Sequence, residues 1–133
     1  MSTLVDSNIL LDLLDEDDEW MEWSASMLAQ AAERGRVVIN PLIYAETSVA
    51  FDTIEELEEV LPAAFFVREA LPWEAGFLAA KAFTGYRRRG GTRRSPLPDF
   101  YIGAHAAIAG HTLLTRDPKR YRPYFPKLRI IAP

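Results

Sequence analysis

The stretch "RVVINPLIYAETSVAF", residues 36–51, decides the fold class, because it joins a strand signal directly to a helix start. The β-branched run at residues 36–40 predicts a short buried strand. Asn40 is a typical helix N-cap, and Pro41 suits the first helical position. A buried strand that runs straight into a helix is the unit from which covered parallel sheets are built.

The same alternation of strands and helices continues along the chain. The predicted strands carry apolar residues without alternation, which is typical of a parallel sheet covered on both faces. They lie at residues 3–6, 36–40, 64–67, 112–115 and 128–132, and the predicted helices at residues 7–15, 18–35, 40–51, 53–63, 72–91 and 99–110. Residues 1–133 therefore predict a single α/β domain, a three-layer α/β/α sandwich with a central, mainly parallel sheet of about five strands.

Charge is distributed very unevenly along the chain. The net charge is −4, but residues 1–80 hold 17 acids and 3 bases, whereas residues 81–133 hold 2 acids and 12 bases. A strongly basic half is typical of a protein that binds a polyanion. Asp99 and Asp117 are the two acids within that basic half, where an acid weakens anion binding unless it holds a cation.

Composition restricts the cellular setting. Hydrophobic residues make up 49% of the 133 residues, which is typical of a globular domain, and there is no cysteine. The first residues have no basic leader, and no apolar run is long enough to span a bilayer. We therefore expect a soluble, cytoplasmic protein with no membrane partner.

Four acids occupy the places where ligands bind in such a sheet. Asp6 ends the first predicted strand and Asp117 follows the fourth. Glu46 lies in the second turn of the helix after the second strand, and Asp99 opens the helix before the fourth. Ligands of doubly wound sheets bind at the carboxyl ends of the strands and at the adjoining helix N-termini. We therefore expect the four carboxylates to share one edge of the sheet.

Crowded carboxylates repel one another, and a hard cation relieves that repulsion. Oxygen ligands favour Mg²⁺ or Mn²⁺ over zinc, and such an ion beside a basic surface suits phosphodiester hydrolysis. Each acid also has a structural explanation: Asp99 could cap a helix, Asp117 could start a turn, and Glu46 could lie on a solvated face. Asp6 is the hardest to explain in this way, because an acid that ends a buried strand is costly without a partner. Taken together, the four favour a site.

Four motifs resemble the PIN domain family, and within it the VapC-type toxins of toxin–antitoxin pairs. They occur in the family's order over nearly the whole chain, and are "LVDSNILLDLL" (4–14), "NPLIYAE" (40–46), "LPDFYIGAHAAIAG" (97–110) and "LLTRDPKRYRPYFPKLRIIAP" (113–133). The resemblance implies one PIN domain over residues 1–133 and an endoribonuclease dependent on Mg²⁺ or Mn²⁺. The family's catalytic, metal-holding acids match Asp6, Glu46 and Asp99, and the fourth falls on Asp117. Small polar residues that support such a site are Ser7, Asn8 and Thr115.

One departure from the family concerns the fourth acid. Many relatives have Asn at the position of Asp117 and a further Asp a few residues on, before an aromatic residue. Here that later position is Arg120, followed by Tyr121. Asp117 is then the one candidate for the fourth acid, and the sequence leaves open whether it contacts a metal directly. The resemblance also implies a homodimer and a cognate, VapB-like antitoxin that wraps the toxin and blocks the acidic pocket.

Basic residues flank the predicted acidic site in sequence. Five arginines fall within eight residues around Gly90 and Gly91, more than a helix dipole requires, and we interpret them with Arg116 as contacts to the RNA backbone. These predicted RNA-binding residues are Arg87, Arg88, Arg89, Arg93, Arg94 and Arg116, and Lys119, Arg120 and Arg122 could extend the surface. His105 lies on a different helix face from Asp99 and is interpreted as a packed or partly exposed histidine rather than a ligand.

The sequence was also compared with four alternative functions, and it argues against three of them. A receiver domain needs a lysine after a late strand, and none is placed there; a haloacid-dehalogenase-type phosphatase needs a second Asp where Asn8 stands. A PIN nuclease that processes RNA without an antitoxin shares every motif with a toxin. A degenerate module that binds RNA or a partner without catalysis is disfavoured by the presence of all four acids.

Overall fold

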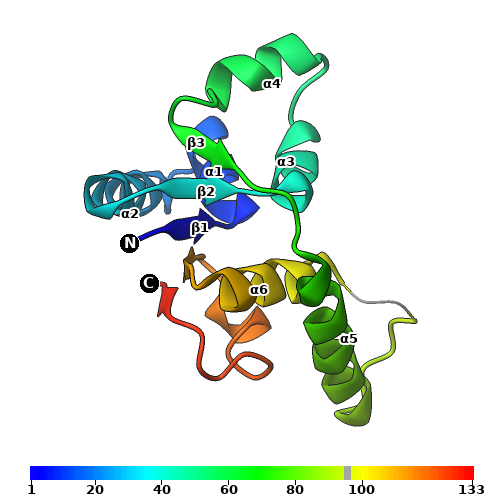
Figure 1. Cartoon of the computed structure of the whole chain (residues 1–133). Coiled ribbons are helices and arrows are strands. Elements are labelled where there is room, and N and C mark those ends of the chain that lie inside the picture. Colours follow the sequence, from blue (N-terminus) through cyan, green and yellow to red (C-terminus); the bar gives the residue numbers. More distant parts are fainter. Residues whose placement is uncertain (95–96) are drawn as a thin grey trace.

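Five short parallel strands form the centre of the molecule in the computed structural model, which describes residues 1–94 and 97–133 (Figure 1). The strand order is β3-β2-β1-β4-β5 and every neighbouring pair is parallel. The elements are β1 (Thr3–Val5), α1 (Ser7–Leu14), α2 (Met21–Arg34), β2 (Val37–Ile39), α3 (Pro41–Ser48), α4 (Ile54–Val60), β3 (Phe66–Arg68), α5 (Trp73–Arg88), α6 (Pro98–Ala109), β4 (Thr112–Leu114), η1 (Pro118–Arg120) and β5 (Ile130–Ile131). The predicted α/β class and five-stranded parallel sheet are confirmed.

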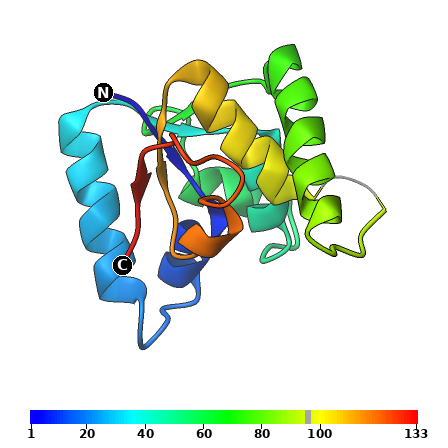
Figure 2. The same ribbon diagram turned by 90° about the horizontal axis from the view of Figure 1, so that it is seen from below.

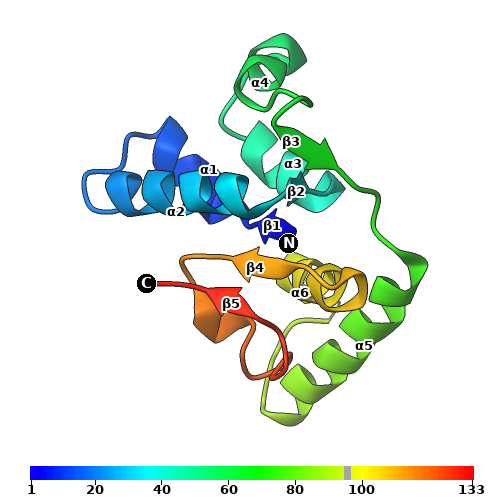
Figure 3. The same ribbon diagram turned by 60° about the vertical axis from the view of Figure 1, so that its left-hand side comes forward.

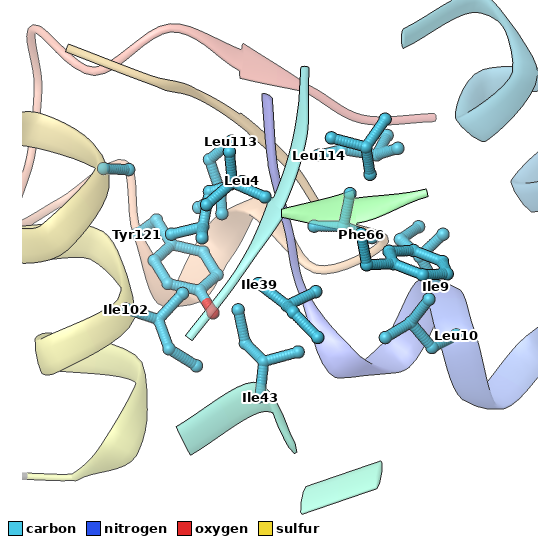
Figure 4. Packing of buried hydrophobic residues seen from close by; sticks show 14 of the residues in the cluster. Leu4, Ile9, Leu10, Ile39, Ile43, Phe66, Ile102, Leu113, Leu114 and Tyr121 are labelled. Carbon is cyan, nitrogen blue, oxygen red and sulfur yellow. The ribbon is translucent and has the colours of Figure 1, made fainter. Parts of the chain in front are cut away.

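Helices cover both sides of this sheet, as the uniformly apolar strands predict. Figures 2 and 3 show α1 and α2 on one side of the strands and α5 and α6 on the other. Leu4, Val38 and Leu113, from the three inner strands, are fully buried. Figure 4 shows such side chains packed together with residues of α1, α3 and α6. Burial of this kind stabilises the fold by about 1.5–3 kcal/mol for each large apolar side chain.

Local signals set several element boundaries. Asn40 caps α3 as predicted, since its side-chain oxygen accepts a hydrogen bond of 2.9 Å from the backbone N–H of Ile43. Gly110 ends α6 in the left-handed conformation at φ 73°, which glycine adopts without steric cost. β3 starts two residues later than predicted, at Phe66, and β5 is reduced to Ile130–Ile131.

The start of α6 differs from the prediction. The helix begins at Pro98 rather than Asp99, and the position before it is Leu97, which has no side-chain cap. Proline suits the first helical position, because its missing N–H would be unsatisfied there. Asp99 lies in the first turn of α6 and does not cap the helix. Ser95 and Pro96, between the predicted helices at 72–91 and 99–110, lie outside the described residues.

Candidate active site

The four predicted acids come from four segments that meet at the carboxyl edge of the sheet. Asp6 follows β1 directly, and its backbone N–H donates to the carbonyl of Leu114 at the end of β4. Asp117 follows β4 and precedes η1, Glu46 is on α3, and Asp99 is in the first turn of α6. Because β1 and β4 are neighbours in the sheet, their following residues are brought together although the sequence separates them widely.

Asp6 is the buried centre of the site, with 3% of its surface exposed. Its Oδ2 accepts hydrogen bonds from Tyr121 Oη at 2.7 Å, Thr115 Oγ1 at 2.9 Å and Asn8 Nδ2 at 3.4 Å. Burial raises the pKa of the Asp6 carboxyl, and the hydrogen bonds from Tyr121 and Thr115 offset this only in part. All three of these side chains act on the same oxygen, which leaves Oδ1 as the ligand atom they do not occupy.

Thr115 and Asn8 connect Asp6 to the loop after β4. Asn8 Nδ2 also donates to Thr115 Oγ1 at 3.2 Å, and Asn8 Oδ1 accepts from the backbone N–H of Arg116 at 3.2 Å. Thr115 Oγ1 accepts in turn from the backbone N–H of Asp117 at 3.0 Å. The structure therefore places both predicted support residues where they fix the position of Asp6 relative to Asp117.

Glu46 and Asp99 face Asp6 from their helices. Ser7, the third predicted support residue, donates through Oγ to Glu46 Oε1 at 3.1 Å. Burial raises the pKa of Glu46, and the negative charges of Asp6 and Asp99 raise it further. Burial also raises the pKa of Asp99, with the charge of Asp6 as the second cause. Glu46 and Asp99 therefore lie within electrostatic reach of Asp6, and a cation placed among the three carboxyls would stabilise their ionised forms.

Tyr121 is a site residue that the sequence analysis did not find. Its ring is fully buried among core side chains (Figure 4), yet its hydroxyl reaches both Asp6 Oδ2 at 2.7 Å and Asp99 Oδ1 at 3.3 Å. Burial and the charges of Asp6 and Asp99 raise its pKa well above the ordinary value, so the hydroxyl stays protonated and donates. The one available sequence signal was the aromatic residue after Arg120, which by itself predicts packing.

Arg120 is the second site residue that sequence reasoning placed elsewhere, on an extended RNA surface. Its Nε donates to Asp117 Oδ2 at 2.7 Å, and its Nη1 lies 3.5 Å from Asp99 Oδ2. Although partial burial alone would lower it, the charges of Asp99 and Asp117 raise the pKa of Arg120. At the position where the family resemblance leads one to expect an acid, this chain therefore has an arginine, and its guanidinium pairs with Asp99 and Asp117.

The donor set of this edge fits a hard divalent cation. Asp6, Glu46, Asp99 and Asp117 offer only carboxylate oxygens, and the nearby neutral groups are hydroxyls and an amide. Carboxylate and hydroxyl oxygens are the ligands that Mg²⁺ and Mn²⁺ prefer. Burial raises the pKa of Asp6, Glu46 and Asp99, and repulsion by neighbouring carboxylates raises the pKa of Glu46 and Asp99 further; such a cation relieves both costs.

A separate group with metal-ligand chemistry consists of Glu69, His105 and His111, and its His105 contacts Asn40. Its ligand atoms lie within 4.8 Å of one another, and both histidine Nε2 atoms contact Glu69 Oε1, at 3.1 and 2.7 Å. Of the two predicted states of His105, packed or partly exposed, the structure shows the packed one, since the residue is fully buried.

The hydrogen bonds of His105 determine which ring nitrogen carries the proton, and this tautomer disfavours metal binding. Asn40 Oδ1 accepts from a backbone N–H in capping α3, so Asn40 Nδ2 is the atom that faces His105 Nδ1 at 3.0 Å. That Nδ1 must then accept, and the proton lies on Nε2, where it is donated to Glu69. A metal at Nε2 would require the opposite tautomer, so this group is better explained as a buried hydrogen-bond network that joins β3 to α6.

Arg116 does not lie free on an RNA-facing surface. Its Nε and Nη2 donate to the two carboxylate oxygens of Asp12, each at 2.8 Å, and its guanidinium lies 5.3 Å from the ring centre of Trp20. Asp12 is 3% exposed and also accepts from Ser24 Oγ at 2.7 Å. Arg116 therefore neutralises the buried Asp12 of α1. This pairing was not predicted from the sequence.

The other predicted RNA-binding arginines lie at the end of α5 and in the loop after it. Arg87 donates to the backbone carbonyl of Arg93 at 2.7 Å, and Arg89 stacks on the ring of Tyr124 at 5.2 Å. Arg88, Arg93 and Arg94 are exposed. Asp99 lies in the first turn of α6, the next helix along the chain. The basic segment therefore precedes this acid of the site in sequence.

A family model described as "PIN domain" matches residues 3–126. The chain belongs to the PIN domain family. PIN domains are generally nucleases that hydrolyse phosphodiester bonds. The match spans all four acids and the basic segment.

Solved structures share this PIN fold at low sequence identity. VapBC2 from Rickettsia felis bound to a DNA fragment is similar with a TM-score of 0.75 and 17% identity, over 99% of this chain and 98% of that chain. VapBC-1 from nontypeable Haemophilus influenzae gives 0.74 and 18%, over 99% and 98%. A toxin–antitoxin complex from Klebsiella pneumoniae gives 0.67 and 21%, over 97% and 95%. No curated protein matches the chain.

Among the described residues, none of the helices combines the length and apolar character needed to cross a membrane.

Proposed function

We propose that this PIN domain is an endoribonuclease dependent on Mg²⁺ or Mn²⁺ that acts as the toxin of a toxin–antitoxin pair. The observation that carries the proposal is the convergence of Asp6, Glu46 and Asp99 at one edge of the sheet. Burial raises the pKa of each of the three, and the charge of Asp6 raises the pKa of Glu46 and Asp99 further. Such an arrangement is unfavourable without a cation and suits one. The chain's membership of a family of nucleases gives that cation a use.

The side chains divide the work between them. Asp6 and Asp99 would hold the cation, with Tyr121 and Thr115 fixing the Asp6 carboxylate through its Oδ2. Glu46, half-buried and with a raised pKa, suits the acceptance of a proton from the attacking water, and Ser7 orients it. A bound ion would lower the pKa of a coordinated water and would place positive charge beside the phosphate.

The basic segment of α5 would carry the RNA backbone. Arg88, Arg93 and Arg94 are exposed, and phosphate contacts from such arginines supply affinity without sequence preference. RNA rather than DNA is proposed from the VapC-type motifs. A protein antitoxin that covers the acidic edge, and a homodimer in the cytoplasm, are proposed on the same resemblance and on the toxin–antitoxin complexes among the structural neighbours.

Cleavage of purified total RNA and transfer RNA by the isolated protein tests this function. We expect discrete fragments with Mg²⁺ or Mn²⁺ and none with EDTA. The Asp6→Ala variant should be inactive, whereas Asp18→Asn, which changes the charge equally on an exposed loop residue, should cleave normally. Equal cleavage by Asp6→Ala would show a contaminating nuclease. A folded wild type that binds RNA but never cleaves would favour the non-catalytic module.

Toxin activity is tested separately by expression in a bacterial host. We expect growth arrest with the wild type and normal growth with Asp6→Ala. Arrest should be relieved by coexpression of a small DNA-binding protein encoded immediately upstream, if it is the antitoxin. Cleavage in vitro without growth arrest would instead support a PIN nuclease that processes RNA.

A further inference from the structure

Arg120 brings a positive charge into the acidic edge from within the same chain. It is the last residue of η1, and its guanidinium contacts Asp117 at 2.7 Å and Asp99 at 3.5 Å. The pairing is not buried, because 58% of the Arg120 side chain and 39% of the Asp117 side chain are exposed. An ion pair this open is weak and can be exchanged for another partner.

The backbone beneath this arginine is held firmly while the guanidinium is not. Tyr121, the next residue, is fully buried and hydrogen-bonded to Asp6 and Asp99. The backbone N–H of Arg120 donates to the carbonyl of Asp117 at 3.3 Å, which closes the turn. A fixed backbone with a long exposed side chain lets the guanidinium change partner without any change of fold.

The carboxylates that Arg120 contacts belong to the set proposed to hold the cation. Asp99 and Asp117 cannot give the same oxygens both to a guanidinium and to a divalent ion. Arginine is also the side chain best suited to phosphate, because its planar donors match two phosphate oxygens at once. The residue that neutralises the site is therefore one that the substrate itself would attract.

We propose that Arg120 is a displaceable counter-ion, which pairs with Asp99 and Asp117 in the metal-free protein and moves to the RNA phosphate when a divalent cation takes over the carboxylates. The proposal rests on the proposed nuclease function. It assigns two opposite effects to one side chain: Arg120 weakens cation binding and strengthens binding of the phosphate. Replacement of an arginine with a purely structural role would not tighten cation binding and at the same time weaken phosphate binding.

Titration calorimetry with Mn²⁺ measures the first effect in the full chain. We expect Arg120→Gln to bind Mn²⁺ about tenfold more tightly than the wild type, because it removes a competing charge next to the ligands. Arg120→Lys, which keeps the charge, should bind Mn²⁺ about as the wild type does. Arg122→Gln is the matched control, since Arg122 is exposed two residues along and has no acidic partner among the described residues.

RNA cleavage at saturating Mn²⁺ measures the second effect. We expect Arg120→Gln to lower kcat/KM at least tenfold despite its tighter Mn²⁺ binding, and Arg120→Lys to lower it by less. Equal or weaker Mn²⁺ binding by Arg120→Gln would overturn the proposal, and so would undiminished cleavage. Failure of the proposed function looks different: the wild type would then bind no Mn²⁺, or Asp6→Asn would bind it equally well.

Discussion

Replacement of Arg116 by methionine should destabilise the protein rather than merely weaken RNA binding. Arg116 contacts both carboxylate oxygens of Asp12 at 2.8 Å, and Asp12 is 3% exposed. Methionine keeps much of the aliphatic stem and the contact with Trp20 but removes the charge. Asp12 would be left as a buried carboxylate supported only by the hydroxyl of Ser24.

The expected cost follows from the burial of the two partners. Removal of one member of a fully buried ion pair costs roughly 3–5 kcal/mol. The Arg116 side chain is 31% exposed, so water screens part of the pair, and we expect about 2–3 kcal/mol. For a chain of this size that corresponds to a fall in Tm of roughly 10 °C.

Thermal and urea denaturation measure this cost. The Asp12→Asn, Arg116→Met double variant should recover a large part of the lost stability, because no buried charge remains unpaired. Arg88→Met is the matched control: Arg88 is exposed at the end of α5, so its loss should change stability by less than about 0.5 kcal/mol. An unchanged Tm in Arg116→Met, with RNA affinity reduced as much as in Arg88→Met, would refute the reasoning and return Arg116 to the RNA-binding surface.

Asp99→Asn should leave the protein folded, as judged by circular dichroism, and reduce RNA cleavage below detection; unchanged cleavage would remove Asp99 from the site. Asp6 has a raised pKa in the folded state, so its ionisation costs stability that protonation restores. In EDTA the wild type should therefore be less stable than Asp6→Asn at neutral pH, and the gap should close as the pH falls through that raised pKa; a gap that widens in denaturation curves would reverse the sign. Gly103→Ala should destabilise the protein by about 1–3 kcal/mol, because a Cβ there would lie 2.4 Å from the buried ring of Phe125, whereas Gly76→Ala meets nothing within 4 Å and should stabilise α5 by about 0.5–1 kcal/mol; equal Tm shifts in the two would contradict this packing.

Much of the fold was predictable because its signals are local. The buried strand that ends at Asn40 and the proline after it define a strand–helix unit within a few residues. Repetition of that unit implies a parallel sheet, and a parallel sheet brings the residues after neighbouring strands to one edge. The convergence of Asp6 and Asp117 follows from this topology alone, and the structure confirms that placement.

The contacts that the sequence did not reveal join residues far apart in the chain. Tyr121 reaches Asp6 across 115 positions and Arg116 reaches Asp12 across 104. No local pattern distinguishes a tyrosine that packs from one that also donates to a buried carboxylate. Arg120 was assigned by its charge to the basic surface, whereas the short turn η1 directs it to the acids. Side-chain direction in such turns depends on tertiary contacts rather than on periodicity.

The location of a bound metal tests the central claim most directly. Crystals of the wild-type protein soaked in MnCl₂ and measured at the manganese absorption edge would locate the ion by its anomalous signal. The account predicts a peak contacted by Asp6, Asp99 and Glu46 and a peak lost in Asp6→Asn crystals. A peak at Glu69, His105 and His111, with none at the acidic edge, would contradict it.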